Sequence, residues 1–226
     1  MKKGDHRLLK EACVKFVAGV LLVAILVFLP AGTLHYPGAW LLMAVLFIPM
    51  FFAGLVMWRK APALLESRLQ AKEREGQQKQ VIGLSALMFL GGFILAGLDH
   101  RYHWTAMPKW LSVAAAMVFL LGYLMFAEVL RENAYLSRTV EVQEGQTVVS
   151  TGLYGVIRHP MYSATLLMFL AMPLVLGSWI SFVVFLVYPM LLYKRILNEE
   201  MLLKEQLHGY TAYCKKVRYR LIPYIW

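Results

Sequence analysis

Charged residues are scarce in this chain of 226 residues, since only 16% are Asp, Glu, Lys or Arg whereas 60% are hydrophobic. Soluble domains carry charge on about a quarter of their residues. A soluble fold with this composition would have too few charged side chains to cover its surface. The shortage of charge therefore indicates a protein whose apolar surface lies in a lipid bilayer.

Cysteine is nearly absent as well, because Cys13 and Cys214 are the only two. Two cysteines in a chain of this length exclude a disulfide framework. The sequence also lacks a phosphate-binding P-loop, a nucleophile elbow and the glycine fingerprint of dinucleotide-binding domains. His100 and His103 have the spacing of metal ligands, but no Cys or Glu lies near them in the sequence, so we predict no metal site.

Long uncharged runs fill much of the chain. The run Phe16–Trp58 has 43 residues, enough for two membrane spans of about 20 residues each. The run Met161–Tyr193 has 33 residues, and Gly177-Ser178 is a plausible hairpin tip within it. Two runs of 18 residues lie between them, at Val81–Leu98 and Trp110–Ala127. We therefore predict an all-α polytopic membrane bundle of five to six transmembrane helices, followed by a C-terminal helical segment.

The positive charges are distributed unevenly around these spans, and the net charge is +10. With six spans, one side of the membrane holds 21 of the 23 Lys and Arg residues, while the other holds Arg101 and Lys109. Loops rich in Lys and Arg stay in the cytosol, so we expect both termini and the polar working surface there. Anionic lipid headgroups then account for the positive charge, and no nucleic-acid partner is needed. Residues 59–80 are either an interfacial amphipathic helix or a solvated charged connector.

A first candidate site lies in residues 146–162, QTVVSTGLYGVIRHPMY. Pro160 suits the first position of a helix, because the amide that proline lacks would be unpaired there. His159 then caps that helix, whose start favours a carboxylate or a phosphate. Tyr154 lies in a glycine-flanked turn just before it. Alternatively, Arg158 and His159 are interfacial residues that cap a transmembrane helix.

A second candidate site lies in residues 193–223, where Arg195 and Glu199 are four residues apart and share one helix face. Glu200 points about 100° away from Glu199. A cation and a carboxylate just below the membrane boundary suit a zwitterionic ligand, or an acidic acceptor held by Arg195. The alternative is an intrahelical salt pair worth a few tenths of a kcal/mol.

The motifs TGLYGVIRHPMY, RILNEE and GYTAYCKKVRYRLIP occur in this order, and together they resemble the isoprenylcysteine carboxyl methyltransferase family of integral membrane enzymes. The resemblance covers about residues 143–223. It implies S-adenosylmethionine as cofactor, bound without a Rossmann domain, and it divides the chain into N-terminal spans (1–130) and a cofactor-binding, catalytic region (131–226). Leu153 and Gly155 depart from the family pattern, which often has proline and a polar residue at these positions.

The resemblance also implies the roles of individual residues. Arg195 matches the arginine associated with the methyl acceptor, and Arg195 and Glu199 are the expected catalytic residues. The expected cofactor-binding residues are Gln146, Thr147, Val148, Val149, Tyr154, His159, Pro160, Met161, Tyr162 and Glu199.

The acceptor would be a lipidic or small membrane-partitioned molecule. A carboxylate acceptor needs no general base, whereas an amine or a thiol would need Glu199 or Glu200. The competing functions are a small membrane transporter and a non-catalytic membrane scaffold. A proton- or ion-coupled transporter usually has ionisable residues near the middle of the membrane, and the apolar runs contain almost none.

Overall fold

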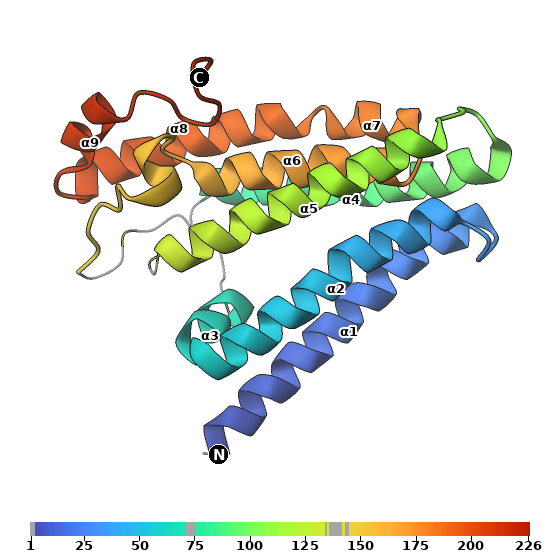
Figure 1. Ribbon diagram of the computed structural model, residues 1–226, viewed down its shortest axis with the longest axis horizontal. Helices are drawn as coiled ribbons and strands as arrows, with labels where there is room; N and C mark the ends of the chain where they lie inside the picture. Colours follow the sequence, from blue (N-terminus) through green and yellow to red (C-terminus); the bar gives the residue numbers. More distant parts are fainter. Residues whose placement is uncertain (1–2, 71–75, 134, 136–141, 143–144) are drawn as a thin grey trace.

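The computed structural model describes residues 3–70, 76–133, 135, 142 and 145–226. The predicted all-α fold is confirmed, because helices dominate these residues (Figure 1). In chain order the elements are α1 (Lys3–Ala31), α2 (Pro37–Lys60), α3 (Pro62–Gln70), α4 (Gly76–Tyr102), α5 (Lys109–Glu132), the 3-10 turn η1 (Gly152–Gly155), α6 (Pro160–Val175), α7 (Trp179–Phe185), α8 (Tyr188–Gln206) and α9 (Tyr210–Lys216).

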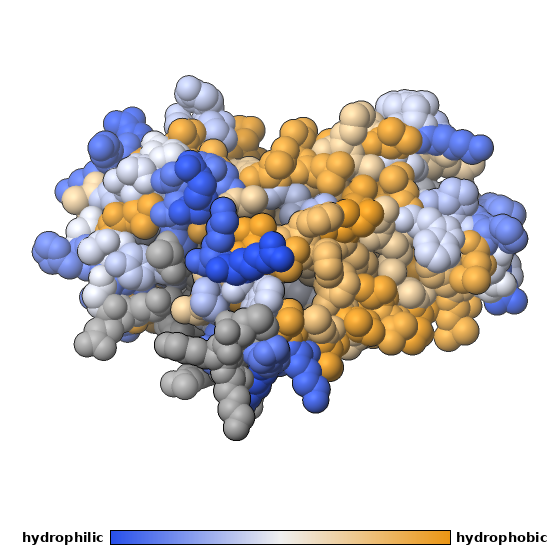
Figure 2. Space-filling view, turned by 60° about the horizontal axis from the view of Figure 1, so that its bottom comes forward, coloured by the Kyte–Doolittle hydropathy of each residue, from blue (hydrophilic) through white to orange (hydrophobic). Residues whose placement is uncertain are grey.

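The described residues contain five stretches long and apolar enough to cross a membrane, and α6 is a shorter apolar helix of 16 residues. This agrees with the five to six predicted spans. Large apolar side chains such as Leu29, Leu124 and Met190 are mostly exposed, as expected for a surface that faces lipid. Figure 2 shows that apolar residues cover the middle of the molecule and that hydrophilic residues gather toward its two ends.

The last two spans meet in a tight hairpin at the predicted place. Gly177 has a positive φ of 78°, which glycine adopts without strain. Ser178 follows as the N-cap of α7 and accepts a hydrogen bond from the amide of Ser181. The hydroxyl of Ser178 also donates to the buried carboxylate of Asp99 at the end of α4. The hairpin is therefore fixed to the helix beside it.

The final span is interrupted, which its apolar composition did not predict. It runs over Trp179–Gln206, and a turn at Leu186 and Val187 separates α7 from α8. Pro189 explains the break, because proline has no amide to donate and its ring clashes with the carbonyl four residues earlier, here that of Phe185. The polar second half of α8 then carries the chain out of the apolar layer.

A short helix forms within residues 59–80, as the first of the two alternatives requires, and its placement at the membrane interface stays a prediction. It is α3, whose residue Leu65 is buried while Glu66 and Ser67 are exposed. The backbone of α3 contacts both α1 and α2. Residues 71–75 of this loop lie outside the described residues.

Helices α1 and α4 cross at very close range, and a glycine makes this possible. A Cβ atom added at Gly97 would lie 2.5 Å from the carbonyl oxygen of Val27 and 3.0 Å from the amide nitrogen of Ala31. Both are backbone atoms, so the clash would be relieved only if the helices moved apart. Small residues at such crossings let helices in membranes pack closely.

We expect Gly97→Ala to destabilise the protein, because overpacking at a rigid contact costs about 1–3 kcal/mol. The melting temperature in detergent should fall by about 5 °C. Gly91→Ala is the matched control, since Gly91 also lies in α4 and a Cβ atom there would meet nothing within 4 Å. Equal melting temperatures for the two variants would contradict this close crossing.

Candidate functional site

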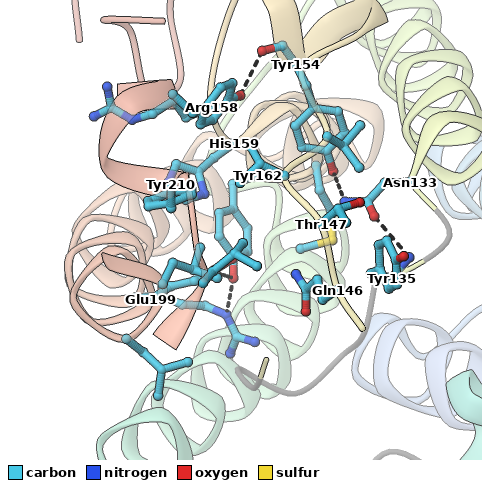
Figure 3. A pocket seen from close by; sticks show the side chains of 18 residues that line it. Asn133, Tyr135, Gln146, Thr147, Tyr154, Arg158, His159, Tyr162, Glu199 and Tyr210 are labelled. Atoms are coloured by element: carbon cyan, nitrogen blue, oxygen red, sulfur yellow. Dashed lines mark hydrogen bonds between the residues drawn. The ribbon is translucent and has the colours of Figure 1, made fainter. Parts of the chain in front are cut away.

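One pocket lies at the end of the bundle near α9, where the start of α6 faces the polar half of α8 (Figure 3). Its walls come from the segment after α5, from η1, and from helices α6, α8 and α9. The residues that line it are Asn133, Tyr135, Gln146, Thr147, Val148, Val149, Tyr154, Arg158, His159, Met161, Tyr162, Arg195, Glu199, Leu202, Leu203, Leu207, Tyr210 and Tyr213.

The structure brings together all but one of the residues proposed from the sequence. Pro160 is the exception, because it is a fully buried first residue of α6 and does not line the pocket. Proline suits this position because the amide that it lacks would be unpaired there. Its neighbours His159 and Met161 line the pocket. Residues of both candidate segments, 146–162 and 193–223, therefore line the same pocket.

Sequence reasoning missed several lining residues. Leu202 and Leu203 follow Glu199 by three and four positions, so helical periodicity alone places them on the same face. Tyr210 and Tyr213 belong to the GYTAY motif that carried the resemblance, but no role was assigned to them. Asn133 caps the end of α5 and has no distinguishing signal in the sequence.

Tyr162 lies between the two expected catalytic residues of α8. Its hydroxyl donates to a carboxylate oxygen of Glu199 at 2.5 Å and accepts from Nε of Arg195 at 2.8 Å. The guanidinium of Arg195 also lies over the Tyr162 ring, 5.7 Å from its centroid. The four-residue spacing of Arg195 and Glu199 on α8 makes this arrangement possible, since it points both side chains at the start of α6. A cation and a carboxylate are thus held side by side in the pocket wall.

Glu200 has a different role from that of its neighbour, as expected from the 100° turn between them. It is 2% exposed and does not line the pocket. Its carboxylate accepts from Nε of Arg158 at 2.7 Å and from Nε of Arg220 at 3.1 Å, and it lies 3.2 Å from Nε2 of His159. Of the two glutamates, Glu199 is therefore the one available to a ligand.

The C-terminal segment is held against the start of α6 by backbone hydrogen bonds. The amides of Arg158 and His159 donate to the carbonyl oxygens of Tyr219 and Arg220, each at 2.9 Å. The Arg158 guanidinium also donates to the carbonyls of Val217 and Arg218. Arg158 is 8% exposed, so it is a buried structural link rather than an interfacial capping residue.

Tyr154 forms another wall and is fixed at both ends. Its hydroxyl accepts from the side-chain amide of Asn133 at 2.9 Å, and its carbonyl accepts from the hydroxyl of Tyr213 at 2.7 Å. Burial raises the pKa of Tyr154 to about 12, so the ring stays neutral at physiological pH. The pocket therefore has a rigid, uncharged aromatic wall.

Comparisons with known proteins bear on the family and on the fold. Residues 113–205 match the model of the isoprenylcysteine carboxyl methyltransferase (ICMT) family. This matched stretch is about two fifths of the chain, and within it the chain is similar to that family. Its fold is similar to that of the eukaryotic intramembrane Ras methyltransferase ICMT, with a TM-score of 0.59 and 19% sequence identity, over 93% of this chain and 75% of that chain.

A curated relative with a different activity is also similar to this chain. Delta(14)-sterol reductase TM7SF2 of Mus musculus is 31% identical over 91 residues, which are 39% of this chain and 22% of the reductase. The chain thus spans about a fifth of the length of this relative. Because the similarity covers so little of the reductase, the chemistry of this chain has to be argued from its own pocket.

We expect Glu200→Gln to destabilise the protein strongly, because removing one partner of a buried ion pair leaves the other charge uncompensated, at about 3–5 kcal/mol. The melting temperature in detergent should fall by roughly 5–10 °C. Glu205→Gln is the matched control, an exposed glutamate on the same helix. A Glu200→Gln variant as stable as the control would refute the role assigned to this carboxylate.

Proposed function

We propose that the protein is an S-adenosylmethionine-dependent methyltransferase of the membrane, which methylates a carboxylate or another nucleophilic group of a lipidic or small membrane-partitioned acceptor. The observation that carries the proposal is the pocket in which Glu199, Tyr162 and Arg195 converge beside the start of α6. The match of residues 113–205 to the methyltransferase family model supports the reaction class.

The donor set of the pocket fits this cofactor. When bound, S-adenosylmethionine supplies a methyl group activated by a sulfonium cation. The carboxylate of Glu199 suits an ammonium or hydroxyl group, and the faces of Tyr154 and Tyr162 suit a cation. The start of α6, with His159 beside it, suits a carboxylate. Apolar side chains of Val148, Leu203 and Leu207 suit a flat base.

Arg195 holds the acceptor. A guanidinium binds a carboxylate in a two-pronged contact, and this contact orients the acceptor oxygen for in-line approach at about 3 Å. A carboxylate is ionised at neutral pH, so the protein has only to align two molecules and exclude water. Tyr162, which accepts a hydrogen bond from Arg195, fixes the direction of the guanidinium.

A lipidic acceptor has a suitable place to lie. A cavity of about 520 Å³ separates α4 from α8, and its lining residues are Gln80, Val81, Leu84, Leu191, Lys194, Leu197, Asn198 and Met201. Leu84 and Met201 are about half exposed on the apolar side of the molecule. Lys194 lines this cavity and Arg195, the next residue, lines the polar pocket, so two faces of α8 contact two different cavities.

The bias of Lys and Arg supports an orientation in which the pocket opens to the cytosol. The cofactor then enters from water and the acceptor enters sideways from the bilayer. Neither alternative function gains support, since a transporter or a scaffold has no need for a carboxylate, a cation and aromatic faces in one pocket at the bundle end.

The proposal is tested by isothermal titration of S-adenosylmethionine into detergent-purified protein. Glu199→Gln should weaken binding about 10- to 100-fold, because hydrogen bonds to a charged group contribute about 1.5–3 kcal/mol. Glu205→Gln should bind as the wild type does. Absence of binding in folded wild-type protein, together with binding of NADPH, would replace the methyltransferase with a reductase.

The variant Arg195→Ala tests whether this residue acts on the acceptor rather than on the cofactor. With N-acetyl-S-farnesylcysteine as the acceptor probe, kcat/KM for the probe should fall about 100-fold, because one partner of a charged contact is lost. The affinity for S-adenosylmethionine, measured by titration, should change less than threefold. Comparable losses of both quantities would overturn this division of roles.

A further inference from the structure

Tyr210 is a pocket residue to which neither the family resemblance nor the mechanism assigns a role. It is the first residue of α9 and only 4% exposed, and its side chain lines the pocket. Figure 3 shows it beside His159 and Glu199. Its ring packs against Tyr213, with the ring centroids 5.7 Å apart.

The hydroxyl of Tyr210 is buried and has no hydrogen-bond partner. Buried polar groups without a partner are rare in folded proteins, because such a group loses its hydrogen bonds to water and gains none in return. The thiol of Cys214, one turn further along α9, lies close enough to interact with the hydroxyl. A thiol is a weak hydrogen-bonding group, and the geometry of this contact falls short of a hydrogen bond.

The neighbouring tyrosine on α9 makes the contrast clear. The hydroxyl of Tyr213, which is also buried and also lines the pocket, donates to the carbonyl of Tyr154 at 2.7 Å. The fold therefore satisfies one phenol of this pair and leaves the other unsatisfied. Tyr210 lines a pocket that suits a polar ligand. A ligand that accepts a hydrogen bond from its hydroxyl would explain why the fold provides no strong partner for this donor.

The hydroxyl can act as a donor at physiological pH. Burial, with the carboxylates of Glu200 and Glu199 nearby, holds the pKa of Tyr210 well above its usual value. The phenol therefore keeps its proton, and the group it satisfies must offer a lone pair. S-adenosylmethionine offers such groups in its carboxylate, its ribose hydroxyls and its base.

We propose that Tyr210 is a cofactor-binding residue, whose hydroxyl donates a hydrogen bond to bound S-adenosylmethionine and so contributes to affinity. The inference rests on the proposed function. It differs from a structural role in a measurable way. The hydroxyl lowers the stability of the ligand-free protein and contributes only to the affinity for the ligand.

Tyr210→Phe tests this with two measurements that should respond in opposite senses. The melting temperature of the ligand-free variant in detergent should equal that of the wild type or exceed it by about 1–3 °C, since an unsatisfied buried group is removed. Its affinity for S-adenosylhomocysteine, measured by titration, should fall about 5- to 10-fold, the loss expected for one hydrogen bond.

Tyr213→Phe is the matched control, because it removes a satisfied hydroxyl from the same helix and should lower the ligand-free melting temperature. A comparable fall for Tyr210→Phe would assign that hydroxyl a structural partner and overturn the proposal. Unchanged affinity of Tyr210→Phe, while the wild type binds, would also overturn it and leave the methyltransferase function standing. A folded wild-type protein that binds neither S-adenosylhomocysteine nor S-adenosylmethionine would refute the function and the role of Tyr210 together.

Discussion

The buried carboxylate of Glu200 is the constraint on which the rest of the site depends. It joins three parts of the chain, because it accepts from Arg158 before α6, lies beside His159 at the start of α6, and accepts from Arg220 in the C-terminal segment. A carboxylate that is 2% exposed is tolerated because the guanidinium groups of Arg158 and Arg220 compensate its charge. By fixing the segment before α6 to α8, Glu200 sets the distance across which Tyr162 reaches Glu199.

The sequence predicted the spans well, because an uncharged run of sufficient length has few alternatives to a membrane helix. It also predicted most of the pocket, because the four-residue spacing of Arg195 and Glu199 and the proline at the start of α6 are local signals. It placed Glu199 and Glu200 on different helix faces, but it could not give the partners of Glu200, since these depend on which residues of other segments face its side chain. The same holds for Arg158, whose carbonyl partners lie about 60 positions away.

The fold is similar to that of a methyltransferase, and 91 residues are similar to part of a sterol reductase, so the chemistry has to be argued from the pocket. The pocket of this chain offers one carboxylate and one cation, Glu199 and Arg195, in contact with the same phenol. The other arginine in its wall, Arg158, is engaged with Glu200. Such a set suits a zwitterionic cofactor better than one with several phosphates, which would call for several cations.

The most direct test of this account is a crystal structure of the protein grown in a lipid phase with saturating S-adenosylhomocysteine. The account predicts ligand density between the start of α6 and α8, with the Glu199 carboxylate in hydrogen-bonding distance of the ligand and the Arg158–Glu200 contact unchanged. Density at another place on the molecule, or an empty pocket at saturating ligand, would contradict it.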